Sequence, residues 1–255
     1  MKNILIMGIA RAGKTTLSEM LKDKYNSYNL IHSDSLKWAM IRAEDKEKYY
    51  RTNVDKQKEF EHGEYFQKTL LEFFNSSISK DKNHYGYILE SGQLHPKIVK
   101  EMIDFKKTIV VCLGLGNLNV DEMVELCIEH DIEKDWTFGL SREYLKKHAI
   151  DWYSANEMLK KECPEYRIKY YDTSENREQV LNDIMYGFIN DYDSNPRESV
   201  TKDDVVYKVI SLNKVSGYVN EYINNDSVSN ILSELEKNYY VPSSVFKDTY
   251  KGLLI

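Results

Sequence analysis

The chain has 255 residues, of which 42% are hydrophobic, enough for one sizeable core or for a core with an appendage. Its formal net charge of −6 argues against a basic nucleic-acid-binding surface, although a few local cations could still bind a phosphate-bearing ligand. No run of about 18 apolar residues occurs, so we expect no membrane span.

Residues 8–15 read Gly-Ile-Ala-Arg-Ala-Gly-Lys-Thr, which fits the G-x-x-x-x-G-K-S/T pattern of nucleotide-binding phosphate loops. An apolar run at residues 3–7 predicts a buried strand before the loop. Residues 16–21 predict a helix after it, with Leu17 and Leu21 on one face. Strand, glycine-rich loop and helix are the context that this motif requires. We therefore predict that the loop binds a nucleoside triphosphate.

The residue types of the loop have separate physical tasks. Glycine allows backbone turns that a Cβ would block, and it lets phosphate approach the loop amides closely. Lys14 should reach the β- and γ-phosphates, and the Thr15 hydroxyl should bind Mg²⁺. The predicted cofactor-binding residues of the loop are Gly8, Arg11, Ala12, Gly13, Lys14, Thr15 and Thr16.

Four further short apolar runs follow, with helical stretches between them, at residues 30–32, 85–90, 108–113 and 167–171. This alternation predicts an α/β fold in which helices cover a parallel five-stranded sheet. Between the second and third runs, apolar residues recur at the helical spacing typical of a core-facing helix. They are Phe60, Leu70, Phe73, Phe74 and Ile78.

Polar residues follow the second run, where ligands bind in open α/β sheets. The carboxylate of Asp34 could accept a proton from a substrate hydroxyl or hold a Mg²⁺-bound water. Alternatively, it could cap the helix expected at residues 36–43. Lys37 comes one turn later on the same helix face, where it could meet a substrate phosphate or be a plain surface lysine.

Glu90 ends the third run, in the place of a Walker-B acid that organises Mg²⁺ through water. A carboxylate at the end of a buried strand is costly unless paired, which favours a functional role. Gly92 then allows a sharp turn. The predicted substrate-binding residues are Asp34, Lys37, Arg42, Glu90 and Gly92, and the predicted metal-binding residues are Thr15 and Glu90.

Four segments, residues 8–15, 33–37, 89–96 and 171–176, together resemble the adenylate-kinase-like group of P-loop small-molecule kinases, which includes the 2-phosphoglycerate kinase and zeta-toxin-like types. The resemblance covers about residues 1–190. It implies a doubly wound parallel sheet of P-loop kinase type. It also implies a substrate-binding insertion, which we place at residues 44–80, and an arginine-bearing lid, which we place at residues 134–150.

The resemblance also assigns roles to single residues. It implies Asp34 as the base, Lys37 in the place of the group's arginine and Glu90 near Mg²⁺. Thr173 and Arg177, in the stretch 172–177, would lie against the nucleotide base.

In the lid, Arg142, Lys146 and Lys147 are spaced at helical intervals and could clamp the transferring phosphoryl group. The alternative for this cluster is a solvated helix face. Arg11 stands where the group usually has proline, glycine or serine, and its side chain could contact phosphate or point to solvent.

A turn-rich break at residues 191–196 divides a kinase-like domain, residues 1–193, from a helical C-terminal extension, residues 196–255. Residues 201–204 read as a helix start, with Val205, Val206, Val209 and Ile210 behind it. The resemblance does not account for this extension.

These observations favour an ATP- and Mg²⁺-dependent phosphotransferase that moves the γ-phosphoryl group to a small-molecule hydroxyl or phosphate, with Lys14, Asp34 and Arg142 as catalytic residues. The alternative is a nucleotide-dependent switch that engages a protein partner through the C-terminal helices. Acidic charge argues against a nucleic-acid motor. The oligomeric state stays open.

The three cysteines are odd in number and show no metal-binding spacing. Cys112 lies in an apolar run, which predicts a reduced core thiol. Free thiols and ATP chemistry indicate a cytoplasmic protein. The apolar N-terminal stretch is too short for a signal peptide and runs directly into the phosphate loop.

Overall fold

The computed structural model describes residues 2–25, 27–81, 85–133, 135–193, 199–202 and 205–208. The chain divides into two units, residues 1–189 and 190–255, which we describe separately.

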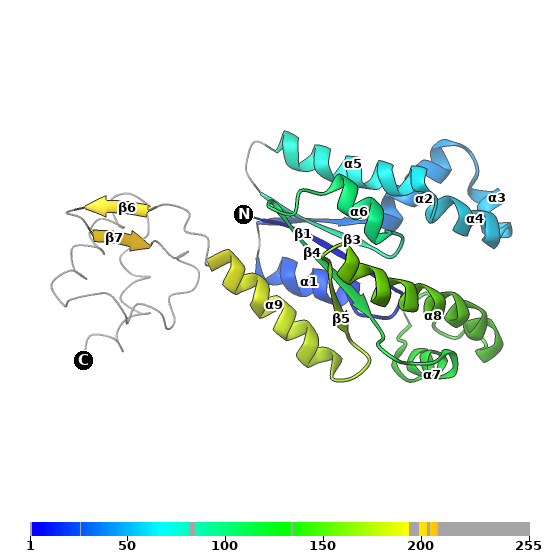
Figure 1. Cartoon of the computed structure of the whole chain (residues 1–255). Helices are drawn as coiled ribbons and strands as arrows, with labels where there is room; N and C mark the ends of the chain where they lie inside the picture. Colours follow the sequence, from blue (N-terminus) through cyan, green and yellow to red (C-terminus); the bar gives the residue numbers. More distant parts are fainter. Residues whose placement is uncertain are drawn as a thin grey trace. The chain divides into compact units, whose positions relative to one another are not determined.

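The first unit is built on a sheet of five parallel strands in the order β2-β3-β1-β4-β5 (Figure 1). The strands are β1 (Asn3–Gly8), β2 (Tyr28–His32), β3 (Gly86–Ser91), β4 (Thr108–Gly114) and β5 (Lys169–Asp172). Each apolar run of the sequence forms one of these strands, so the predicted parallel α/β sheet is confirmed. Parallel strands need crossover connections, and the helices between them supply these.

The helices cover both faces of this sheet (Figure 1). They are α1 (Lys14–Lys24), α2 (Ser33–Ala43), α3 (Glu47–Thr52), α4 (Val54–Glu61), α5 (Glu64–Lys80), α6 (Pro96–Met102), α7 (Val120–His130), α8 (Arg142–Glu165) and α9 (Arg177–Asp193). Helices α1 and α9 lie on one face, and α5 and α6 lie on the other (Figure 1). This is the doubly wound arrangement that we expected. None of the described helices has the length and apolarity needed to cross a bilayer.

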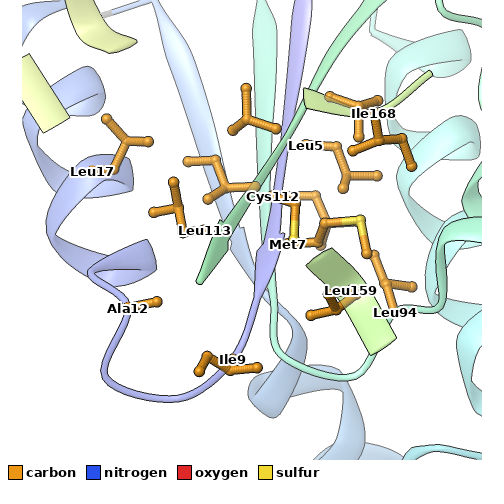
Figure 2. Packing of buried hydrophobic residues seen from close by; sticks show 14 of the residues in the cluster. Leu5, Met7, Ile9, Ala12, Leu17, Leu94, Cys112, Leu113, Leu159 and Ile168 are labelled. Atoms are coloured by element: carbon orange, nitrogen blue, oxygen red, sulfur yellow. The ribbon is translucent and has the colours of Figure 1, made fainter. Parts of the chain in front are cut away.

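Buried side chains alternate between the two faces of the strands, as the two-residue period of a strand requires. Met7 and Cys112 lie with Leu159 of α8 on one face, whereas Leu113 lies on the face covered by Leu17 of α1 (Figure 2). Each such side chain contributes roughly 1.5–3 kcal/mol by leaving water. Cys112 is buried and free, as predicted.

The register of the sheet brings the strand ends to one edge. Met7 of β1 is opposite Ser91 of β3, and Gly8 is opposite Leu113 of β4. His32 at the end of β2 is opposite Glu90. The polar residues that follow these strands therefore converge beside the phosphate loop.

The insertion after β2 forms α3, α4 and α5, and α5 packs on the core through Phe66, Leu70 and Phe74. These residues are four apart and share one helix face. The prediction that Phe73 belongs to the core is wrong, because its side chain is 46% exposed. Phe73 lies about 100° from Phe74 around the helix, on the side away from the buried Leu71, so it falls at the edge of the core-facing stripe.

In the second unit, residues 199–202 and 205–208 form the antiparallel strands β6 (Ser199–Lys202) and β7 (Val205–Lys208). The prediction of a helix start at residues 201–204 is therefore wrong for the described part of this segment. β6 contains valine and threonine, and β7 contains two valines and a tyrosine. These residues favour extended backbone, and this preference outweighs the capping pattern. The remaining predicted helices of the extension lie outside the described residues.

The adjacent phenylalanines of α5 provide a test of the helix register. Phe74→Ala removes a fully buried ring and should lower the free energy of unfolding by about 3–5 kcal/mol. Phe73→Ala removes a half-exposed ring from the same helix and should cost clearly less. Urea denaturation of both variants measures the difference. Equal losses would contradict the register described above.

Candidate active site

The phosphate loop leaves β1 where only glycine fits. A Cβ on Gly8 would lie 1.9 Å from the carbonyl oxygen of Leu113, and the residue has a φ of 139°. Gly13 caps α1 with a φ of 89°, without a side-chain cap and without an acidic residue in the first turn. The first amides of a helix have no partner within the helix, so these donors can bind an anion.

Lys14 lies beneath this loop, and its side chain is buried. Its Nζ donates a hydrogen bond to the Ile9 carbonyl at 2.7 Å, which uses one of the three donors of the ammonium group. Burial lowers the pKa of Lys14, although the charges of Glu90 and Asp34 act to raise it. The structure therefore brings together the lysine that we predicted to bind phosphate and the two predicted acids.

Thr15 and Thr16 are exposed at the start of α1, so their hydroxyl groups can reach a ligand. Among the described residues, no three histidine, cysteine, aspartate or glutamate side chains converge on a metal site. Magnesium in kinase sites needs only one or two protein ligands, because substrate phosphates and water complete its shell. One hydroxyl and one acid near the strand ends fit this requirement.

Asp34 lies in the first turn of α2, and its side chain is 65% exposed. Its Oδ1 accepts hydrogen bonds from Lys37 Nζ at 2.9 Å and from Gln93 Nε2 at 3.1 Å. The helix cap is His32, and no side chain completes it, so the capping alternative for Asp34 is not what the structure shows. The carboxylate is held by two donors and open to solvent.

The amide of Gln93 is oriented by neighbours that the sequence analysis did not single out. Its Oε1 accepts hydrogen bonds from Ser33 Oγ at 2.6 Å and from Ser91 Oγ at 3.0 Å. These two bonds turn the Nε2 donor toward Asp34. The signal available in the sequence was the position of Ser91 and Gln93 on either side of Gly92, directly after β3.

Lys37 is not a surface lysine, because only 6% of the residue is exposed. Its Nζ contacts Glu61 Oε2 at 2.7 Å as well as Asp34. Burial alone would lower the pKa of Lys37, but the charges of Glu61 and Asp34 raise it above its ordinary value. Glu61 ends α4 and was missed by the sequence analysis, because its contact with α2 is a tertiary one.

Glu90 lies at the end of β3, as predicted, and its Oε2 is 3.1 Å from Nδ1 of His32. The glutamate is largely buried, whereas His32 is partly exposed. We expected the buried carboxylate of Glu90 to need a polar partner, and His32 supplies one. His32 itself was not predicted to take part. Gly92 follows, and it borders Lys14, whose Nζ would lie 3.7 Å from a Cβ at that position.

The side chain of Arg11 neither points to solvent nor is directed to the position expected for phosphate, the two alternatives that the sequence left open. Its side chain forms ion pairs with Asp131 and, at 3.3 Å, with Asp135, both in the loop after α7. Arg11 and Asp131 are mostly buried, and the arginine has a left-handed φ of 65°. The phosphate loop is thus bound to the segment that precedes the predicted lid helix, and the guanidinium is directed to these carboxylates.

The predicted lid cations are also paired within the protein. Arg142 at the start of α8 is exposed and pairs with Glu125 of α7, and Lys146 pairs with Asp121 at 2.7 Å. This is the solvated helix face that the sequence analysis kept as the alternative. In this structure the cations bind α7 and not the loop.

Thr173 and Arg177 lie beside the loop, on the side of β5 and α9. The buried hydroxyl of Thr173 is 3.0 Å from the carbonyl oxygens of both Ala12 and Gly114, so it links the loop to β4. Burial, followed by the charge of Arg11, lowers the pKa of Arg177. Its buried Nε has no hydrogen-bond partner within the described residues. Arg177 is thus available to a ligand, whereas the Thr173 hydroxyl serves the protein.

Arg42 is not brought to the site. It ends α2 about 12 Å along the helix from Asp34, and it pairs with Glu47 at 2.8 Å. The arginine lines a surface groove on the insertion together with Asp45, Lys48 and Arg51. The prediction that Arg42 binds substrate therefore has no support in this geometry, because the helix carries it away from the strand ends.

No protein-family model matches the sequence, and the search of curated proteins found no significant match. Among solved structures, the chain is similar to shikimate kinases from Bacteroides thetaiotaomicron and Acinetobacter baumannii, with identities of 17% and 18% and TM-scores of 0.41 each. They cover 73% and 78% of this chain and 96% of their own.

A gluconokinase from Sinorhizobium meliloti is similar at 13% identity with a TM-score of 0.45, over 73% of this chain and 90% of that one. Identities and scores this low carry no argument about activity, which rests on the geometry of the site.

The ion pairs of Arg11 lead to a stability prediction. Arg11→Met leaves the buried Asp131 carboxylate without its cation and should lower the free energy of unfolding by about 3–5 kcal/mol. Adding Asp131→Asn should recover part of the loss, because the uncompensated charge is then gone. Urea denaturation of the single and double variants measures both effects. A loss below about 0.5 kcal/mol in Arg11→Met would contradict a structural role for the pair.

The lowered pKa of Lys14 leads to a pH prediction. Bound phosphate stabilises the ammonium form, so ATP should raise the pKa of Lys14 again. Just below the ordinary lysine value of 10.5, the complex then holds more protons than the free protein. Binding should take up protons there, and affinity should fall as the pH rises. Calorimetry in two buffers of different ionisation enthalpy measures this uptake, which Lys14→Met should lack.

Proposed function

We propose that this protein is a cytoplasmic phosphotransferase that uses ATP and Mg²⁺ to phosphorylate a small molecule at a hydroxyl or phosphate group. The observation that carries the proposal is the segment that links Asp34 to Lys14: Gly92 borders the Lys14 ammonium group, and the next residue, Gln93, donates a hydrogen bond to Asp34. The side chains of Asp34 and Lys14 come from different strand ends, and the charge of Asp34 acts on the pKa of Lys14. A carboxylate next to a phosphate-binding lysine is suited to activate the group that receives the phosphoryl group.

The loop residues would bind the nucleotide. The free amides at the start of α1 would hold the phosphate oxygens, and Lys14 would replace water around the β- and γ-phosphates with its remaining donors. The Thr15 hydroxyl and, through water, Glu90 would hold Mg²⁺. ATP supplies the phosphoryl group, and Mg²⁺ neutralises part of the charge that develops on it.

Asp34 would orient the acceptor hydroxyl and take its proton. Both donors that hold the carboxylate bind Oδ1, and the side chain is exposed, so Oδ2 can accept a hydrogen bond from a bound acceptor. Lys37 and Gln93 would fix the direction of the carboxylate, which supports a near-attack geometry.

Residues 44–80 would bind the acceptor, and residues 134–150 would close as a lid. In this proposal Arg142 and Lys146 exchange their partners on α7 for the transferring phosphoryl group. Solvent screens these exposed ion pairs, so they contribute little to stability and the exchange is energetically inexpensive. Closure would exclude water and limit hydrolysis of ATP. The proposal includes membership of this protein in the group of 2-phosphoglycerate kinase and zeta-toxin-like kinases.

Two variants separate binding from transfer. Lys14→Ala removes the cation at the β- and γ-phosphates and should lower phosphoryl transfer to any acceptor by about 10²–10³-fold or more. Asp34→Asn keeps the size of the side chain and should retain ATP binding while lowering kcat by about 10²–10⁴-fold. A coupled ATP-consumption assay over nucleosides, sugars and hydroxy acids, with calorimetry for ATP, measures both.

Glu59→Gln is a suitable control, because Glu59 is exposed and pairs with Lys56 on the outer side of α4. Phosphoryl transfer that persists in Lys14→Ala would contradict the proposal. Slow ATP hydrolysis that no acceptor accelerates would favour the nucleotide-dependent switch.

A further inference from the structure

The positive charge of Lys37 is paired with carboxylates of the protein itself. This lysine is the buried cation on the acceptor side of the site, and two carboxylates, Asp34 and Glu61, lie within 2.9 and 2.7 Å of its ammonium group. A phosphate or carboxylate on the acceptor would have to compete with both of them. The position that could bind an anionic acceptor is therefore neutralised from inside the protein.

The charges around Lys37 leave a negative excess. Asp34 and Glu61 supply two carboxylates against the single ammonium group of Lys37, and Glu90 adds a third carboxylate at the neighbouring strand end. Burial lowers the pKa of His62, beside Glu61, so this ring is neutral at pH 7 and adds no positive charge. An acidic acceptor would meet like charge here, which costs affinity.

A cation of the insertion is paired as well. Lys58 of α4 pairs with Asp151 of α8. Lys147, one turn before Asp151 on α8, is exposed, so solvent and salt screen its charge. The pair between Lys58 and Asp151 also shows that this side of α8 faces the insertion.

The same side of α8 carries an aromatic cluster. The ring of His148 lies 5.1 Å from that of Trp136 and 6.0 Å from that of Trp152, and Trp136 is 58% exposed. Burial lowers the pKa of His148, so the cluster is uncharged at pH 7. Exposed aromatic faces attract ammonium groups and do not attract anions.

We infer that the acceptor is a hydroxyl compound without a carboxylate or phosphate group, and that a protonated amine on it strengthens binding. This inference rests on the proposed phosphoryl transfer, and it narrows the acceptor that the proposal left open. The carboxylates beside Lys37 would bind the amine and hydroxyl groups, and the aromatic cluster would cover the other side of the molecule.

The experiment compares acceptors that share a carbon skeleton and differ in charge. One series is glucose, glucosamine, glucuronate and glucose 6-phosphate, and the other is ethylene glycol, ethanolamine and glycolate. Binding is followed by the fluorescence of the three tryptophans, with Mg²⁺ and a non-hydrolysable ATP analogue present, and transfer is followed by ATP consumption. In each series the neutral and amine members should bind at least about tenfold more tightly than the acids.

The variant Glu61→Gln frees Lys37 from one carboxylate and should improve the binding of the acids, relative to glucose, by about tenfold. Glu59→Gln removes the same charge from the outer side of the same helix and should leave the ranking unchanged. Thermal unfolding of both variants checks that they are folded.

Tighter binding of an acid than of its neutral and amine partners in the wild type would overturn the inference. So would binding by no neutral or amine member, or an unchanged ranking in Glu61→Gln. The expected ranking without any Lys14-dependent ATP consumption would instead count against phosphoryl transfer and leave the charge preference standing.

Discussion

The close approach of β1 to β4 at Gly8 is the constraint on which the site depends. The chain can turn out of the central strand there only because no Cβ lies between it and the Leu113 carbonyl. The turn starts the loop that ends at the unsatisfied amides of α1, and it sets Lys14 beneath them. Because parallel strands end at one edge, Asp34 and Glu90 reach the same place from β2 and β3.

Around this loop, ion pairs decide which charges remain available to ligands. Arg11 is bound by Asp131 and Asp135, and Lys37 is bound by Asp34 and Glu61. Lys14, by contrast, is held by a backbone carbonyl. The proposed nucleotide side thus keeps a buried cation that could bind phosphate, whereas the buried cation of the proposed acceptor side is neutralised. This contrast links the proposed transfer from ATP to an acceptor without acidic groups.

Short sequence patterns predicted helices and strands correctly where burial alone decides which residue types occur. The apolar runs predicted the five strands of the parallel sheet, most clearly for β1 and β4, because a strand buried on both faces needs apolar side chains throughout. Helical spacing was wrong for Phe73, because this residue lies at the edge of the buried face of α5 and is half exposed. The capping pattern was wrong for the helix start at residues 201–204, where β-branched residues form strands on either side. Capping patterns and β-propensity compete there, and local sequence does not decide between them.

By itself, the sequence determined the phosphate loop, the parallel sheet and the strand ends at which Asp34 and Glu90 lie, because these depend on short-range spacing and burial. Only the tertiary structure decided the partners of the charged side chains. Arg11 meets acids about 120 residues later, and Lys37 meets an acid on another helix. The physical reason is that an ion pair depends on distance in space, and the packing of helices on the sheet, not the local sequence, sets that distance.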